Sequence, residues 1–365
     1  MNIEELSLEE KIGQLFIVGL DTTNVMNKIE TLILKNKVGG IMLYKKNYKN
    51  YEEMVEIINY IKKLNSKNKV PILIAIDQEG GRVNRMPPDF KKLPSSFKLA
   101  SNSKEENLVE QAGKITGEML SKLGINMDFA PVLDIKRFED KHAIGDRAFS
   151  KHKAEVAKYG IDYMKELQKH NIISVIKHFP GHGASRIDSH VFMPTIYKSV
   201  KRLKNEDMLP FMDAIKSGAD SIMVGHLLVA DLNSIYPASL SDRLINNLLR
   251  KDLGYNGLVI TDDLSMKGIT LLFGITHAAI KAISSGADIV MINKEHKSKI
   301  RIINNLNKIA RKNKNAMKRI NESVERILNI KERYNIQDIL IQNYDVEKIN
   351  EKIDEINNIA RGNEQ

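Results

Sequence analysis

Short apolar runs, each bounded by polar residues, recur along the whole chain. Runs rich in β-branched residues are typical of strands that are buried on both faces. The sequence predicts eight such strands, at residues 15–18, 41–43, 72–76, 127–133, 172–176, 222–224, 258–260 and 289–292.

The segments between these runs repeat their apolar residues at steps of three and four. In residues 104–123 the repeat runs through Leu108, Ala112, Ile115, Met119 and Leu123, and residues 51–64 and 317–331 show the same period. This spacing places the apolar side chains on one face of a helix. Strands that alternate with helices pair in parallel, so eight such units predict an α/β fold with a closed (β/α)8 TIM barrel. The rival fold, an open doubly wound sheet, lacks the Gly-x-Gly-x-x-Gly turn expected after its first strand.

No linker rich in proline, glycine or serine divides the chain, and its end is polar with helical character. We therefore expect a single barrel domain over residues 1–335. Residues 336–365 should form a short helical C-terminal extension, either docked on the barrel or fraying from it.

Composition narrows the possible classes of protein. The chain of 365 residues is 42% hydrophobic and 28% charged, as in ordinary globular proteins. It has no cysteine, which excludes disulfides, thiolate metal sites and a cysteine nucleophile. The net charge of +10 is compatible with an anionic partner, but the lysines are scattered and no basic run is interleaved with aromatic residues. We therefore expect no binding of nucleic acid.

The N-terminus, MNIEELSLEEKIGQLFIVGL, has acidic residues where a signal peptide has basic ones. No apolar run reaches the roughly 18 residues of a membrane span. These features predict a cytoplasmic protein without membrane contact, although a leader removed earlier would leave the same sequence.

Polar residues follow most of the predicted strands. They include Asp77, Asp134, Lys177, His178, His226, Asp262, Asp263 and Asn293, with Arg85 and Arg147 further along two of the loops. The active site of a barrel enzyme lies at the carboxyl ends of its strands. The loops are thus expected to form one convergent polar pocket.

Asp262 directly follows the seventh run, so its side chain should emerge at the mouth of the barrel. A carboxylate there can act as a nucleophile or stabilise a developing cation. The alternative is that Asp262 or Asp263 caps the following helix. Both roles can be present, one for each residue, and Asp262 is the better catalytic candidate because it comes first after the strand.

The stretch KHFPGHGASRIDSH, residues 177–190, offers a proton donor. His190 lies two residues after Asp188, and a carboxylate on one ring nitrogen prepares the other to transfer a proton. The histidines could instead cap surface turns. As a third possibility, His178, His182, Asp188 and His190 could bind a zinc-like ion. Pro180 and Gly181 disfavour the helix that would bring His178 and His182 together, so we expect no metal.

Five further residues are candidate substrate contacts, because a polyhydroxylated ligand requires charged and hydrogen-bonding groups. They are Asp77, Arg85, Arg147, Lys177 and His178. The alternative for each is a salt bridge that closes the top of the barrel.

Together these motifs resemble glycoside hydrolase family 3, in particular its bacterial β-N-acetylglucosaminidase branch. The matching blocks, in order, are DQEGGRVNR, FAPVLDI, IGDRAFS, KHFPGHG with a downstream DSH, GADSIMVGHLLV, PASLS and GLVITDDLSM, and they span residues 8–333. The segment KRFEDKHAIGDR departs from the pattern, since other members carry asparagines before GDR. The second domain of larger members has no counterpart, so the whole site is expected in the barrel.

The resemblance implies a retaining glycosidase that hydrolyses terminal β-linked GlcNAc. Asp262 would form a covalent glycosyl-enzyme, while His190, oriented by Asp188, would protonate the leaving oxygen and then activate water. The substrate contacts would be Asp77, Arg85, Arg147, Lys177 and His178, and His226 would border the same subsite. The implied substrates are peptidoglycan fragments with GlcNAc on an anhydro-muramoyl or muramoyl unit, as in cell-wall recycling. No cofactor is expected, the partner is the small-molecule substrate, and we expect a monomer.

Three other hypotheses remain open from the sequence. A histidine acid/base repels phosphate less than a carboxylate does, which would permit a GlcNAc phosphorylase. A metal-dependent barrel hydrolase and a non-catalytic binder of anionic wall polymers belong to different classes of protein. Chelators would inactivate the metal-dependent hydrolase, and the binder would show salt-sensitive binding without turnover.

Overall fold

The computed structural model describes residues 2–20, 26–103, 107–139, 142–185, 193–232, 234–293, 296–342 and 344–362. Its centre is a closed barrel of parallel strands in the order β1-β10-β9-β7-β5-β4-β3-β2. The strands are β1 Phe16–Gly19, β2 Gly40–Met42, β3 Leu73–Ile76, β4 Met127–Asp128, β5 Ile173–Phe179, β7 Ser221–Val224, β9 Leu258–Asp263 and β10 Ile289–Ile292. The predicted (β/α)8 barrel and its eight strands are confirmed.

Alternate residues of the strands fill the inside of the barrel. Ile17, Met42, Phe129, Val175 and Met223 belong to this inner cluster, and each is almost completely buried. Their neighbours in sequence point outward into a second, larger cluster that lies against the helices. Burial on both faces explains why the strands appear in the sequence as continuous apolar runs.

Three strands differ from their predicted bounds by more than one residue. Strand β5 continues three residues beyond its apolar run, through Lys177 and His178 to Phe179. The fourth run predicts a strand through residue 133, but β4 ends at Asp128 and only an isolated bridge joins Val132 to Lys177. Pro131 lies in this gap and has no N–H to donate to a neighbouring strand. In contrast, β9 continues beyond its apolar run to Asp263, which pairs with Met291 across an irregular register.

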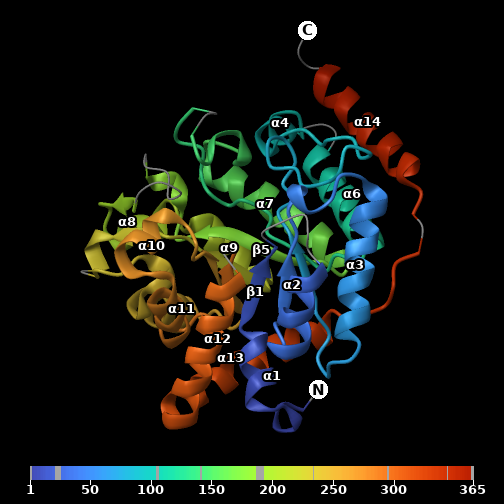
Figure 1. Ribbon diagram of the computed structural model, residues 1–365. Helices are drawn as coiled ribbons and strands as arrows, with labels where there is room; N and C mark the ends of the chain where they lie inside the picture. The colour runs from blue at the N-terminus through green and yellow to red at the C-terminus, as the bar shows by residue number, and fades with distance from the viewer. Residues whose placement is uncertain are drawn as a thin grey trace.

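Helices surround the barrel (Figure 1). The α-helices are α1 Leu8–Gln14, α2 Met26–Glu30, α3 Tyr51–Asn65, α4 Ser96–Ser101, α6 Leu108–Lys122, α7 Lys153–Lys169, α8 Val200–Asn205, α9 Leu209–Lys216, α10 Lys267–Phe273, α11 Ile275–Ser284, α12 His296–Lys312, α13 Lys314–Arg333 and α14 Val346–Gly362. Two π-helical segments are η2 Thr31–Lys35 and η8 Arg243–Asp252. The short 3-10 turns are η1 Ile3–Glu5, η3 Lys45–Asn47, η4 Gly145–Arg147, η5 His182–Ala184, η6 Ala230–Leu232 and η7 Ala238–Leu240. A small separate sheet pairs β6 Thr195–Ile196 with β8 Leu228–Val229.

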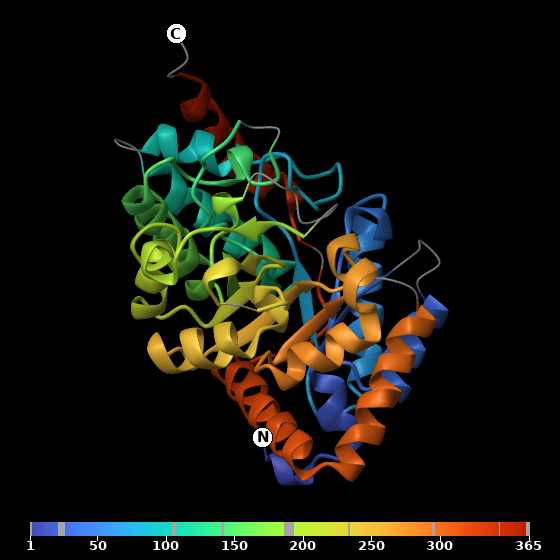
Figure 2. The same cartoon turned by 90° about the vertical axis from the view of Figure 1, so that its left-hand side faces the viewer.

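Helix α13 closes the amino end of the barrel. Its residues Ile327 and Ile330 join the inner apolar cluster, together with Tyr334 and Ile336 just after it. The buried Lys331 donates to Gln14 Oε1, to the carbonyl of Gly39 and to that of Pro71, all of which shortly precede strands. Figure 2 shows α13 below the barrel, with α12 running down the right-hand side to meet it.

After α13 the chain crosses the side of the molecule and ends in α14, beside α6 (Figure 1). Ile349, Ile353, Ile356 and Ala360 of α14 are buried, so the polar C-terminal segment is docked by an apolar face. The domain boundary at residue 335 remains a prediction. None of the described helices has the length and hydrophobicity required to cross a bilayer.

Candidate active site

A cavity of about 280 Å³ lies at the carboxyl ends of the strands. Its lining residues come from the ends of four strands, β2, β3, β9 and β10, and from the loops after them: Tyr44, Lys46, Asp77, Arg85, Asp262, Asp263, Met266, Met291 and Asn293. Three predicted site residues, Asp77, Arg85 and Asp262, thus meet in one cavity. This is the end of the barrel at which the chain was expected to place its chemistry.

The two adjacent aspartates of TDD have different surroundings. Asp263 accepts the N–H groups of Ser265 and Asn293 on Oδ1, and its carbonyl contacts the ring of His226. Burial raises the pKa of Asp263. Asp262 Oδ1 accepts the N–H of Asp263 at 2.7 Å, and Asp262 lines the cavity beside Asp77 and Arg85. Both aspartates line the cavity, but the Asp263 carboxylate organises the end of β9 through these backbone contacts, which makes Asp262 the better candidate to act on a ligand.

Asp77 connects the cavity with a network of buried charges. Lys177 Nζ lies 2.8 Å from Asp77 Oδ1 and 2.5 Å from Glu79 Oε1. Arg147 donates to both oxygens of Glu79, at 2.7 and 2.8 Å, and Arg85 lies 3.5 Å from Asp77. The salt bridges considered as an alternative role are thus present, and they join four predicted substrate contacts in one network.

Opposing effects set the ionisation of this network. Burial alone would raise the pKa of Glu79, but the charges of Arg147 and Lys177 outweigh it and hold that pKa well below its usual value. Burial alone would lower the pKa of Lys177, yet the Asp77 and Glu79 carboxylates raise it above its usual value. Glu79 and Lys177 therefore both stay charged at neutral pH. Fixed charges in a water-poor site suit the recognition of hydroxyl groups.

Glu79 is a residue that the sequence reasoning missed. It is buried, and it orients Arg147, from the loop after β4, and Lys177, from strand β5. Its position two residues after Asp77 was the available signal, since alternate residues of an extended segment point to the same side. Its partners could not be read from the sequence.

His178 is held by Asp134, at the end of the fourth predicted run. Asp134 Oδ2 lies 2.7 Å from His178 Nδ1 and also accepts the His178 N–H, while Oδ1 accepts the N–H of His182. When Nδ1 carries the proton that faces Asp134, Nε2 is the acceptor nitrogen of the neutral ring. Burial alone would raise the pKa of Asp134, but His178 and His182 lower it. Asp134 thus fixes the orientation of a predicted substrate contact.

His226 is not among the residues that line the cavity. The side chain is completely buried, with Nδ1 2.7 Å from Ser239 Oγ and Nε2 2.9 Å from the carbonyl of Asp263. Both ring nitrogens therefore have protein partners. In this arrangement His226 supports the end of β9, and direct contact with a ligand stays a prediction.

The predicted acid/base pair, Asp188 and His190, lies outside the described residues. Two of the four candidate metal ligands are the same residues. Within the described ranges, no group of three or more histidine, aspartate or glutamate side chains is arranged to hold a metal ion.

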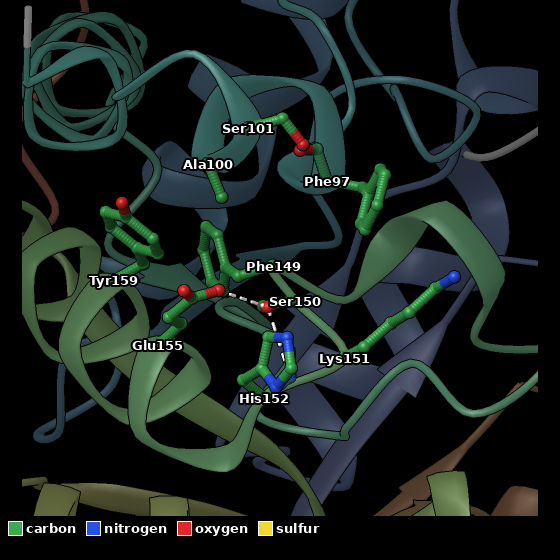
Figure 3. Close-up of a pocket in the computed structure, with 9 residues that line it drawn as sticks. All are labelled: Phe97, Ala100, Ser101, Phe149, Ser150, Lys151, His152, Glu155 and Tyr159. Atoms are coloured by element: carbon green, nitrogen blue, oxygen red, sulfur yellow. Dashed lines mark hydrogen bonds between the residues drawn. The ribbon is translucent and has the colours of Figure 1, made fainter. Parts of the chain in front are cut away.

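A second cavity of about 370 Å³ lies behind the loop that carries Arg147 (Figure 3). It is lined by Phe97, Ala100, Ser101, Phe149, Ser150, Lys151, His152, Glu155 and Tyr159. None of these lining residues is a predicted site residue. Phe149 is buried and packs on Tyr159 at 6.5 Å between ring centroids, so the loop is anchored here by its apolar side.

The profile of the Glycosyl hydrolase family 3 N terminal domain matches residues 7–330. The chain belongs to glycosyl hydrolase family 3. This family 3 glycoside hydrolase is 34% identical over 270 residues to a protein of Photobacterium profundum named Beta-hexosaminidase, covering 74% of this chain and 78% of that protein. It is 28% identical over 290 residues to a Beta-hexosaminidase of Idiomarina loihiensis, covering 79% of this chain and 86% of that protein.

A solved structure shares both fold and sequence with this family 3 hydrolase. The family 3 β-N-acetylglucosaminidase from a Paenibacillus species superposes with a TM-score of 0.91 at 30% sequence identity. The match covers 97% of this chain and 69% of that one. The suspected family membership is therefore confirmed, and the TIM barrel is that of a glycoside hydrolase.

Proposed function

We propose that this glycoside hydrolase is a retaining β-N-acetylglucosaminidase that releases terminal β-linked GlcNAc. The observation that carries the proposal is the position of Asp262 in a cavity shared with Asp77 and Arg85. The names of the relatives and of the similar structure support the sugar specificity. A strand-end carboxylate beside fixed hydroxyl-binding groups is what glycosidic bond cleavage requires.

In the proposed mechanism Asp262 attacks the anomeric carbon and forms a covalent glycosyl-enzyme, as the glycosidic bond to the leaving group breaks. His190 gives its proton to the leaving oxygen and is oriented by Asp188. In the second step His190 takes a proton from water, which attacks the anomeric carbon and releases Asp262. Asp77, Arg85, Arg147, Lys177 and His178 hold the hydroxyl and acetamido groups of the sugar.

The ionic network suits this reaction because it is complete before the substrate arrives. Lys177 and Arg147 are both fixed by Glu79, and His178 is fixed by Asp134. Groups oriented in advance lose little conformational freedom when they bind a ligand. Binding free energy is then available to place the anomeric carbon above Asp262.

We further propose that the natural substrates are peptidoglycan fragments in which GlcNAc is linked to an anhydro-muramoyl or muramoyl unit. The reaction would belong to cell-wall recycling in the cytoplasm. The test is to compare such fragments with chitin oligosaccharides that carry the same terminal GlcNAc. A higher kcat/KM for the muramoyl compounds supports this aglycone, and a clear preference for chitin oligosaccharides contradicts it.

The activity itself is tested with p-nitrophenyl β-N-acetylglucosaminide. The wild-type protein should release p-nitrophenol in the presence of EDTA, and the first sugar product should keep the β configuration by NMR. Asp262→Ala should lower kcat by about four orders of magnitude or more. Asp213→Ala on α9, where the side chain is 39% exposed, is the matched control and should leave kcat unchanged.

Three results would overturn the proposal: near-normal turnover by Asp262→Ala, an inverted first product, or the appearance of sugar 1-phosphate instead of free sugar in phosphate buffer. The last result would identify a phosphorylase. Loss of activity in EDTA, restored by zinc, would identify a metal-dependent hydrolase.

A further inference from the structure

The loop that carries Arg147 is anchored on its C-terminal side, after Arg147, and its N-terminal side is held by a separate set of contacts. Phe149 is buried behind it, and the Ser150 carbonyl accepts the N–H of Lys136 at 2.9 Å. On the N-terminal side, Gly145 has a φ of +47°, a conformation that favours glycine and lets the chain turn sharply before Arg147. Three successive carbonyl groups, those of His142, Ala143 and Ile144, precede this turn and converge on one point.

The group at this point is the guanidinium of Arg82. Its Nη2 lies 2.6 Å from the carbonyl oxygen of His142, 3.1 Å from that of Ala143 and 2.8 Å from that of Ile144. Its Nε lies 3.0 Å from Asp146 Oδ1. Converging carbonyl dipoles repel each other, and a cation placed between them removes this repulsion. Arg82 comes from the β3 loop, so it fastens one loop of the site to another.

Two of these carbonyls also hold Arg147 directly. The oxygen of Ala143 accepts Arg147 Nη1 at 2.9 Å, and the oxygen of Ile144 accepts the Arg147 N–H at 2.9 Å. Arg82 and Arg147 therefore share two acceptors. A shift of these carbonyls would move the Arg147 side chain away from Glu79 and from the substrate.

We propose that Arg82 is a positioning residue for the glycosidase reaction, which fixes the 142–147 loop by its carbonyl groups and so places Arg147 for sugar binding. The inference rests on the proposed function of Arg147 as a substrate contact. All three acceptors are backbone atoms, so the contacts of Arg82 do not depend on which side chains residues 136–142 carry, although the His142 ring also accepts the N–H of Ile144 at 3.3 Å. This explains how the chain departs from the family pattern in that segment while it still presents Arg147.

The alternative role for Arg82 is an ordinary ion pair with Asp146 near the surface, where the side chains are 39% and 26% exposed. Such pairs contribute little to stability. They also require only a charge, which lysine would supply. Contacting the carbonyls with Nη2 while Nε faces Asp146 instead requires the two separated nitrogens of a guanidinium, which the single ammonium of lysine does not supply. The two roles therefore predict different results for the same substitutions.

The main test measures KM and kcat of Arg82→Ala and Arg82→Lys with the aryl GlcNAc substrate. Because Arg147 binds the sugar in both ground and transition states, KM should rise about tenfold or more in Arg82→Ala while kcat stays within about twofold. Arg82→Lys should recover less than half of this loss on a logarithmic scale. Asp146→Asn, which removes only the ion pair, should leave KM unchanged. Full recovery in Arg82→Lys, or an equal rise in KM in Asp146→Asn, would overturn the proposal.

A double-mutant cycle with Arg147→Ala tests whether Arg82 acts through Arg147. In the Arg147→Ala background, Arg82→Ala should change KM by less than about twofold, because the group that it positions is gone. An undiminished tenfold effect would contradict the proposal. Added guanidinium ion at millimolar concentration should lower the KM of Arg82→Ala but not that of Arg147→Ala combined with Arg82→Ala.

Thermal unfolding separates a folding defect from a positioning defect. If Arg82→Ala unfolds below the assay temperature, the comparison of Arg82→Lys with Asp146→Asn still decides. Failure of the proposed function is recognised separately, since the wild-type protein would then not hydrolyse the aryl GlcNAc substrate at all. A wild-type enzyme that is active, together with an unchanged KM in a folded Arg82→Ala variant, contradicts this inference alone.

Discussion

The two ends of the barrel both contain buried charges, but they use them differently. At the amino end, Asp288 is surrounded by Arg250, Arg319 and Arg326 and also accepts from Ser323 and the N–H of Val259. The three arginines line a cavity of about 310 Å³, but the carboxylate of Asp288 is completely buried. At the carboxyl end, in contrast, the carboxylate of Asp77 itself lines a cavity, together with Arg85 and Asp262. Arg85 Nε and Asn293 Oδ1 there have no hydrogen-bond partner among the described residues.

This difference shows how one scaffold separates stability from chemistry. A charge enclosed by protein partners fastens secondary-structure elements together, as Lys331 does below β1, β2 and β3. A charge that is fixed by partners on one side and faces a cavity on the other keeps donors and acceptors for a ligand. Substitutions at the amino end should therefore change mainly the free energy of unfolding, and those at the carboxyl end mainly kcat/KM.

Among the substitutions in the two charge networks, the largest effect is expected for Lys177→Met. This change leaves the carboxylates of Asp77 and Glu79 without their shared cation in a buried site, which costs about 3–5 kcal/mol. The kcat/KM for the aryl GlcNAc substrate should fall by about two to three orders of magnitude. The matched control is Lys49→Met, where the side chain is 82% exposed, and it should change kcat/KM by less than about twofold. A loss of less than tenfold in Lys177→Met would show that the network does not serve the reaction.

A smaller effect is expected for Asp134→Asn, because the amide cannot hold His178 Nδ1 as the carboxylate does. The kcat/KM should fall by about 10- to 100-fold, since a hydrogen bond to a charged group is worth about 1.5–3 kcal/mol. Asp128→Asn is a demanding control, because it makes the same chemical change at another buried aspartate, at the end of β4. Asp128 is completely buried, and burial raises its pKa well above the usual value, so the amide closely resembles the protonated acid. Equal losses of kcat/KM in Asp134→Asn and Asp128→Asn would contradict a specific role of Asp134 in holding His178.

At the amino end, Lys331→Met should lower the free energy of unfolding by about 2–4 kcal/mol, because the acceptors around Lys331 lose a buried donor. The kcat and KM of the folded protein should remain unchanged. Denaturant unfolding and steady-state kinetics on the same sample measure both quantities. An altered KM with unchanged stability would reverse the assignment of the two ends.

The smallest effect concerns the pH dependence of stability. Burial lowers the pKa of Lys331 to about 7, whereas a lysine in the unfolded chain titrates near about 10.4. Between these values the unfolded chain binds more protons, so this group makes the folded state more stable as pH rises from 7. The wild-type protein should gain about 1–2 kcal/mol between pH 7 and 9 relative to Lys331→Met. A constant difference across this range would mean that Lys331 keeps its proton.

The fold was predictable because each strand is buried on both faces and so forms an apolar run that needs no knowledge of its neighbours. The rule that barrel sites lie at the carboxyl ends then indicated Asp77, Lys177 and Asp262. What the sequence could not supply were the partners. Glu79 lies 68 positions from Arg147, and Asp134 lies 44 from His178. Such contacts depend on how the loops fold over the barrel, as does the burial of His226.

Covalent labelling at Asp262 tests the central claim most directly. A fluorinated N-acetylglucosaminyl fluoride that forms the glycosyl-enzyme quickly and hydrolyses slowly should inactivate the protein. Proteolysis and mass spectrometry should then place one N-acetylhexosaminyl group on the peptide that contains Asp262, with fragmentation assigning it to that residue and not to Asp263. A label on another carboxylate, or unlabelled protein that still turns over the natural linkage, would contradict the proposed mechanism.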